Sequence, residues 1–173
     1  MNCKLGGASN YVDSLPMFDR PTMLVGADVT HASPGSQAPS VAAIVTSMDK
    51  NACRYSTFLR AQPPREEVIT EMNSCVGQGL DRFKEAVGIY PERIVCFRDG
   101  VDPGQFNLIR NTEVDGIRKA LESRGLADQC KVTFIIVHKR HHIRLFPMST
   151  SEMDRSGNCC PGTVVYFKSF MLG

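Results

Sequence analysis

The sequence predicts an α/β fold in which helices flank a mixed β-sheet. Three observations lead to this prediction. Three β-prone runs come first, the hydrophobic period changes to that of a helix after Pro63 and Pro64, and helical and strand-like segments then alternate as far as residue 137. With 173 residues, the chain has the length of about one domain and can bury a core.

Five short runs have the composition and length of β-strands. The first three are separated by a loop of Ala, Ser, Pro and Gly and by a turn, which favours an antiparallel meander. The fourth is apolar and ends at Arg98, Asp99 and Gly100, and the fifth is the run KVTFIIV. The predicted strands cover residues 22–29, 41–48, 55–61, 93–97 and 131–137.

Two longer segments have the spacing of amphipathic helices. Apolar residues recur at intervals of three and four from Arg65 to Val87, and a second such segment runs from Gln105 to Arg124. The predicted inner faces are Val68, Met72, Cys75, Val76, Leu80, Phe83 and Val87 in the first helix and Phe106, Ile109, Val114, Ile117 and Leu121 in the second. The order β-β-β-α-β-α-β is that of an RNase H-like domain, although a fold alone does not give a function.

Composition is that of an ordinary globular protein, with 42% hydrophobic and 22% charged residues. The net charge of +2 is too small to indicate nucleic acid by itself. The seven cysteines contain no C-x-x-C pair, so we expect free thiols in a reducing compartment and no zinc site. The absence of a signal peptide and of a long apolar stretch predicts a cytoplasmic protein without a membrane span, with the nucleus as an alternative location.

Two aspartates end predicted strands. Asp28 lies in the run GADVTH, and Asp99 follows the apolar run RIVCF. If the two strands are neighbours, the carboxylates come close together, and such a pair requires a cation such as Mg²⁺. The alternative is that each Asp is an ordinary turn residue at a strand end.

Charged residues elsewhere have weaker signals. Lys139, Arg140, His141, His142 and Arg144 lie within six residues and suit phosphate binding, although a solvated surface would give the same pattern.

Lys4 could also meet a phosphate, but an exposed terminus is the more common explanation of such a lysine. Glu66 and Glu67 are placed in the first turn of the first predicted helix, where acids are favoured by the helix dipole.

Several motifs resemble the Piwi domain of eukaryotic Argonaute proteins, in the family's order and at its spacing. The resemblance covers nearly all of residues 2–165, and FRDGVxxGQF together with KRHHxRLF is highly specific. Residues 2–7 resemble the junction between the Mid and Piwi domains, and residues 156–163 resemble the loop after the basic segment. The other matching motifs are GADVTH (26–31), SVAAIVTSMD (40–49), REEVI (65–69), RIVCFRDGVDPGQF (93–106) and TFIIVHKRHHIRLFP (133–147).

The resemblance implies a catalytic role for three carboxylates. Asp28 and Asp99 match the aspartates that hold Mg²⁺, with Mn²⁺ as an alternative, and Glu67 matches the glutamate that completes the site. Glu66 has no such match. The implied reaction is hydrolysis of a target-RNA phosphodiester opposite the guide.

It also implies an RNA-binding role for five other residues. Lys4 matches a lysine of the pocket for the guide's 5′ phosphate, and the basic segment matches one that lies along the guide backbone. The residues of that segment are Lys139, Arg140, His142 and Arg144. The implied partners are a small guide RNA, a complementary target RNA and proteins of a gene-silencing complex active in RNA interference.

The resemblance stops near Val165. It implies that residues 1–21 end a Mid domain, that residues 22–165 form part of a Piwi domain, and that residues 166–173 are a tail foreign to the family. A fourth metal-site residue, Asp or His in the family, has no counterpart before the chain stops. We therefore expect an incomplete fold at the C-terminus and poor RNA cleavage by the chain alone.

Three functions remain open on these grounds. The chain is a fragment of a guide-directed endoribonuclease, a nucleic-acid-binding module that does not cut, or a truncated product without function.

Overall fold

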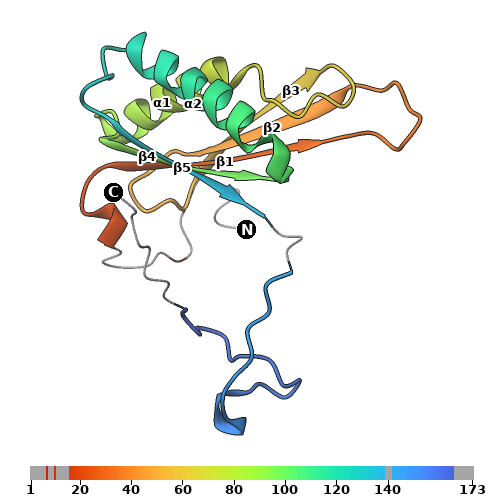
Figure 1. Cartoon of the computed structure of the whole chain (residues 1–173). Coiled ribbons are helices and arrows are strands. Elements are labelled where there is room, and N and C mark those ends of the chain that lie inside the picture. Colours follow the sequence, from red (N-terminus) through yellow and green to blue (C-terminus); the bar gives the residue numbers. More distant parts are fainter. Residues whose placement is uncertain (1–6, 8–9, 11–15, 139–141, 166–173) are drawn as a thin grey trace, which may run out of the picture. The chain divides into compact units, whose positions relative to one another are not determined.

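The computed structural model describes residues 7, 10, 16–138 and 142–165, and it divides into two compact units. The first unit comprises residues 1–139 and contains all five strands and both helices (Figure 1). The second comprises residues 140–173.

A five-stranded mixed sheet forms the centre of the first unit, with the strand order β3-β2-β1-β4-β5. β1 pairs antiparallel with β2, and β2 with β3, whereas β4 is parallel to both β1 and β5. The strands are β1 (Thr22–Thr30), β2 (Ser40–Ser47), β3 (Tyr55–Gln62), β4 (Arg93–Asp99) and β5 (Lys131–Val137). The predicted fold class and element order are therefore confirmed, and β5 has the predicted bounds.

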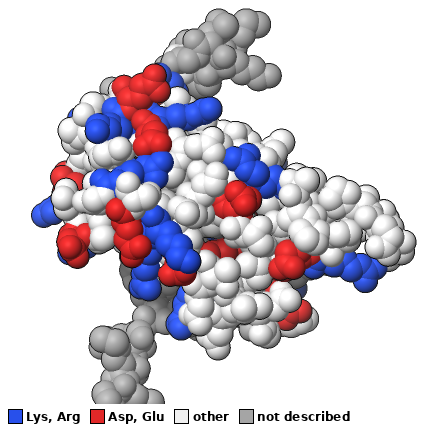
Figure 2. All heavy atoms as spheres, turned by 90° about the horizontal axis from the view of Figure 1, so that it is seen from above, with Lys and Arg blue, Asp and Glu red and all other residues white. Residues whose placement is uncertain are grey.

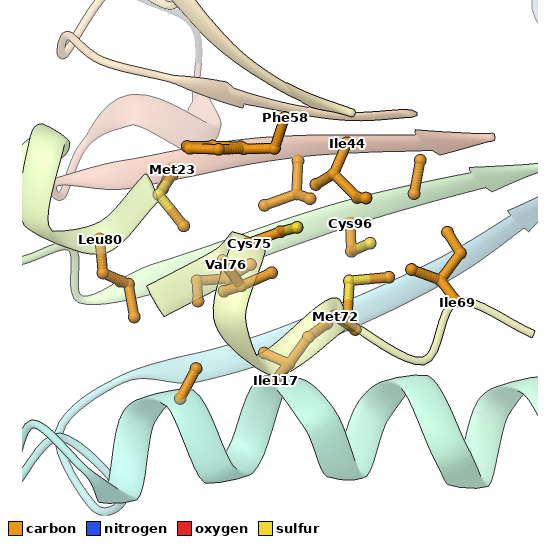
Figure 3. Packing of buried hydrophobic residues seen from close by; sticks show 14 of the residues in the cluster. Met23, Ile44, Phe58, Ile69, Met72, Cys75, Val76, Leu80, Cys96 and Ile117 are labelled. Atoms are coloured by element: carbon orange, nitrogen blue, oxygen red, sulfur yellow. The ribbon is translucent and has the colours of Figure 1, made fainter. Parts of the chain in front are cut away.

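Helices α1 (Met72–Val87) and α2 (Phe106–Glu122) lie on the same face of this sheet and pack against each other (Figure 1). Their apolar stripes meet alternate residues of the central strands, because successive strand side chains point to opposite faces. Short 3₁₀ helices cover Pro16–Phe18, Pro103–Gln105 and Thr150–Glu152. Fully buried side chains of this core include Met23, Ile44, Met72, Cys75, Val76, Leu80, Cys96 and Ile117 (Figure 3). Phe83 is also fully buried.

The first helix begins at Met72, seven residues later than the predicted start at Arg65. Arg65 has a left-handed backbone with φ of +62°, which a helix cannot accommodate. The side-chain amide of Gln62 then donates hydrogen bonds to the carbonyls of Glu66 and Val68. The placement of Glu66 and Glu67 in a first helical turn was therefore wrong, because both lie in the loop between β3 and α1.

The inner face of α2 contains a charged residue that the apolar pattern did not predict. Ile109, Ile117 and Leu121 are buried as predicted, but Glu113 is buried between them with no exposed surface. Phe106 and Val114 are only half-buried.

Charges on the helix side of the first unit alternate in sign. Figure 2 looks onto this side and shows Lys and Arg next to Asp and Glu. Two such pairs are Lys119 with Asp115, 2.8 Å apart, and Arg124 with Asp81, 2.6 Å apart. The Arg124 hydrogen bond lowers the pKa of the Asp81 carboxyl. In the described part of the chain, this face therefore shows a solvated mixture of charges.

The second unit contains a tight acidic turn. Asp154 Oδ1 accepts hydrogen bonds from the backbone N–H groups of Ser156 at 2.8 Å and Asn158 at 2.9 Å, and these bonds lower the pKa of Asp154. Gly157 and Gly162 have φ of +81° and +90°, a backbone conformation that favours glycine. No helix in the described ranges is long and apolar enough to cross a bilayer.

Close contact between α1 and β2 depends on Gly79. A Cβ at this position would lie 2.6 Å from Thr46 Cγ2 and 2.8 Å from its Oγ1. We expect Gly79→Ala to lower the free energy of unfolding by about 1 kcal/mol, because overpacking costs more than the better helix propensity of alanine contributes. Urea denaturation would measure the change.

The double variant provides the control for this contact. Thr46→Ala removes both clashing atoms, and its hydroxyl has no hydrogen-bond partner in the described structure, so little is lost with it. In the Thr46→Ala background the Cβ of residue 46 stays 3.0 Å from the added methyl group, so Gly79→Ala should cost clearly less than in the wild-type background. An equal loss in both backgrounds would contradict the packing explanation.

Thiols of the two units should differ in reactivity. Cys75, Cys96 and Cys130 are buried free thiols, and burial raises the pKa of Cys96 to about 12 and that of Cys130 to about 11. Cys159 and Cys160 are half-buried free thiols. Because the thiolate is the reactive form, iodoacetamide at pH 8 should label Cys159 and Cys160 before Cys96 or Cys130. Peptide mass spectrometry would check the order, and early labelling of Cys96 in native protein would contradict this packing.

Candidate active site

The parallel pairing of β1 with β4 brings the two predicted aspartates to adjacent strand ends. The register places Ala27 opposite Arg98, so Asp28 and Asp99 follow at the next position of each strand. Ala27 and Arg98 are both buried on the helix side. Asp28 and Asp99 therefore share the opposite face of the sheet.

Asp28 is exposed at this edge, and Asp99 is half-buried. Asp28 Oδ1 accepts a hydrogen bond from the Val29 N–H at 2.8 Å. The backbone at Gly100 lies close to the Asp28 side chain, since a Cβ on Gly100 would lie 3.2 Å from Asp28 Oδ1. Gly100 also has φ of +83°, so glycine suits the position on both counts.

Glu67 reaches the same strand ends from the loop before α1. Its Oε2 lies 2.8 Å from His31 Nε2, and its Oε1 accepts a 2.8 Å hydrogen bond from Arg98 Nη2. His31 follows Asp28 by three residues, and Arg98 directly precedes Asp99. The other ring nitrogen of His31 lies 2.8 Å from the hydroxyl of Ser40. The Glu67 carboxylate is thus fixed between the segments that carry the two aspartates.

Arg98 connects this loop to α2 through a buried ion pair. Its side chain and that of Glu113 have no exposed surface, and Arg98 Nε lies 3.1 Å from both carboxylate oxygens of Glu113. Arg98 also donates to the carbonyl of Glu67 at 2.7 Å and to the carbonyl of Asp99. Burial raises the pKa of Glu113, while the Arg98 charge and the Ile69 N–H oppose this effect.

Comparison with known proteins gives the family. The sequence profile of the Piwi domain matches residues 1–172. The chain belongs to the Piwi domain family. Argonaute 12 of Oryza sativa subsp. japonica is 41% identical over 95% of the chain, and argonaute 5 of Arabidopsis thaliana is 41% identical over the same share. The chain spans 18% and 19% of those two proteins, or about a fifth of their length.

Solved structures agree with this assignment. A Kluyveromyces polysporus Argonaute with a guide RNA matches 92% of the chain with a TM-score of 0.75 and 27% identity, and the match covers 20% of that protein. The C-terminal lobe of a budding yeast Argonaute matches 92% of the chain with a TM-score of 0.74 and 28% identity, over 34% of its own length. The RNase H-like fold of the Piwi domain is therefore shared.

The donor set at the Piwi strand ends fits a divalent cation through two carboxylates. Asp28 and Asp99 lie side by side, and one oxygen of Asp28 already accepts a backbone hydrogen bond. No group of three or more His, Cys, Asp or Glu side chains in the described ranges is close enough to hold a metal ion. Glu67 instead contacts His31 and Arg98.

The predicted RNA-binding residues are described only in part. Lys4, Lys139 and Arg140 lie outside the described residues. His142 and Arg144 are exposed in the second unit, where Arg144 Nη1 donates to the Ile143 carbonyl at 2.9 Å. The predicted domain boundaries at residues 21 and 165 stay predictions.

Three residues of this site were not singled out from the sequence. His31 could have been singled out by its position, because it follows Asp28 at a strand end. Glu113 had another, because it falls between Ile109 and Ile117 on an apolar helical face. Arg98 had little signal, since an arginine at a strand end is usually solvated.

Proposed function

We propose that this Piwi domain contributes the metal-binding part of a guide-directed endoribonuclease site in RNA-mediated silencing. The observation that carries the proposal is the parallel β1–β4 register, which supports placing Asp28 and Asp99 side by side. Two adjacent carboxylates repel each other unless a cation neutralises them. A solved structural relative contains a guide RNA, which supports RNA as the ligand of this chain.

Asp28 and Asp99 would hold Mg²⁺, and Mn²⁺ is the alternative ion. When bound, such an ion supplies an activated water and stabilises the leaving oxygen of a phosphodiester. Mg²⁺ suits this position because it prefers oxygen ligands and retains waters that a phosphate can replace.

Glu67 would complete the acidic set, and His31 and Arg98 would hold its carboxylate. Both contacts measure 2.8 Å, so they fix the side chain in one orientation next to His31 and Arg98. Pairing with a guide would select the target sequence, while the protein would hold the RNA backbone and shape. The basic segment at residues 139–144 would provide those backbone contacts.

A second candidate is a guide-binding module that does not cut. It is favoured by the engagement of Glu67 with His31 and Arg98, because no third acidic, histidine or cysteine side chain in the described ranges joins the aspartates. The two candidates share the RNA ligand and differ in metal binding.

Metal titration separates them. Mn²⁺ would be added to the full chain, and bound ion measured by electron paramagnetic resonance. Asp28→Asn and Asp99→Asn should each weaken binding by at least about tenfold, the lower end of the effects seen when even a supporting residue of a metal site is lost.

Asp115→Asn is the matched control, because it removes one negative charge from an exposed surface pair on α2. It should leave Mn²⁺ affinity unchanged. Equal affinity in wild type, Asp28→Asn and Asp99→Asn would reject the metal site and leave the binding module as the function.

A further inference from the structure

Glu113 is the one charged side chain of α2 with no exposed surface. It lies among apolar residues, where a carboxylate is retained at a considerable desolvation cost. Its hydrogen bonds run from α2 to the segments around the candidate site, rather than to neighbouring residues of its own helix. This arrangement suggests that its position serves the site.

One oxygen of Glu113 supports the Glu67 loop at two points. Oε1 accepts from the Ile69 N–H at 3.0 Å and from Arg98 Nε at 3.1 Å. Ile69 lies two residues after Glu67, and Arg98 binds both the carbonyl and the carboxylate of Glu67. Glu113 therefore restrains the loop directly at its backbone and indirectly through the guanidinium.

We propose that Glu113 is a positioning residue that holds Glu67 at the metal-binding end of β1 and β4. This proposal rests on the proposed function for the role of Glu67, but the loop restraint can be tested separately. Glu113 touches neither substrate nor metal in this proposal. It acts through Arg98 and Ile69, because each of these contacts fixes the loop that presents the Glu67 carboxylate.

The chemistry of the contacts defines informative variants. Glu113→Gln keeps a carbonyl oxygen in the place of Oε1, which can accept both hydrogen bonds of that atom, but it loses the charge and the contact of Oε2 with Arg98. Glu113→Met fills a similar volume but accepts neither. Glu113→Asp keeps the charge on a shorter side chain that cannot reach both donors, and it replaces the methionine variant if that one does not fold.

Asp81→Asn is the control for a general loss of stability. It weakens the 2.6 Å pair with Arg124, beyond the C-terminal end of α2, and leaves the contacts of Glu67 intact. All variants would be compared as the full chain at a temperature where each is folded. Two quantities would be measured: amide hydrogen exchange over residues 65–69 and Mn²⁺ affinity.

We expect Glu113→Met to speed exchange over residues 65–69 and to weaken Mn²⁺ binding by about tenfold, as for other supporting residues of metal sites. Glu113→Gln should restore both quantities in part, because it keeps the two hydrogen bonds of Oε1 and loses the charge, and Asp81→Asn should change neither. The losses from Glu113→Met and Glu67→Gln should not add, since both would act through one carboxylate.

Two results would overturn the proposal. One is unchanged exchange over residues 65–69 in Glu113→Met. The other is tight Mn²⁺ binding in that variant although Asp28→Asn abolishes it. If the proposed function is wrong, a different result is expected: the wild-type chain will bind no Mn²⁺ through Asp28. Fast exchange in Glu113→Met, rescued by Glu113→Gln, would then still support the loop restraint.

Discussion

Replacing Arg98 with methionine is expected to lower the free energy of unfolding by about 3–5 kcal/mol, the cost of breaking a buried ion pair from one side. The substitution leaves the Glu113 carboxylate without exposed surface and without its charged partner. It also removes the donors to the carbonyl and the carboxylate of Glu67. Urea denaturation of the full chain would measure the loss.

The loss in Arg98→Met should depend on pH in a defined direction. Burial already raises the pKa of Glu113, and the Arg98 charge opposes that rise. Without Arg98 the folded-state pKa increases further above the unfolded value. Protonation then favours the folded state, so the variant should regain stability towards pH 5 and lose it as pH rises through the folded pKa.

Two further variants control for the size of the substitution. Arg93→Met removes an exposed pair with Asp19, in which the two atoms are 2.6 Å apart, and should cost far less stability than Arg98→Met. The double variant Arg98→Met, Glu113→Met should recover much of the lost stability, because no buried charge is left unpaired. A double variant as unstable as Arg98→Met alone would contradict this account of the pair.

Much of the fold could be predicted because its signals are local. Strand β5 is an uninterrupted β-prone run between a Cys and a His, and its bounds are those predicted. The start of α1 could not be predicted, because the apolar spacing continues backwards into residues 65–71. The left-handed Arg65 and the hydrogen bonds from Gln62 oppose a helix over these residues, so the helix begins at Met72, and Gln62 lies on the preceding strand.

The site was predictable to the extent that it depends on strand ends. Asp28 and Asp99 each end an apolar run, so both could be indicated from the sequence. Their side-by-side placement could not, because it depends on the parallel pairing of β1 with β4 in the sheet. Glu67 could be singled out only through the resemblance to a family, because the sequence pattern does not distinguish it from the adjacent Glu66. The Arg98–Glu113 pair joins strand β4 to helix α2. The hydrophobic pattern of the strand and that of the helix each describe only local structure, so neither could predict this contact.

Neutralising Lys139, Arg140 and Arg144 together, each to Gln, is expected to weaken single-stranded RNA binding by roughly 400-fold at 50 mM salt. Each phosphate contact to a single strand contributes about 0.7 to the slope of log affinity against log salt. Three contacts therefore contribute a slope of about 2. Between 1 M and 50 mM salt, a roughly 20-fold dilution, a slope of that size changes the affinity by roughly 400-fold. Fluorescence anisotropy with a labelled RNA, repeated across salt concentrations, would measure both quantities.

The matched control removes three positive charges from the first unit, with the substitutions Arg110→Gln, Arg118→Gln and Lys119→Gln on α2. Because the acidic and basic side chains there are intermixed, these changes should reduce RNA affinity only slightly and leave the salt slope nearly unchanged (Figure 2). If the two triple variants lose affinity and slope equally, the net charge of the chain drives binding and the basic segment has no special role. If only the variant in residues 139–144 loses both, the contacts to the RNA backbone belong to that segment.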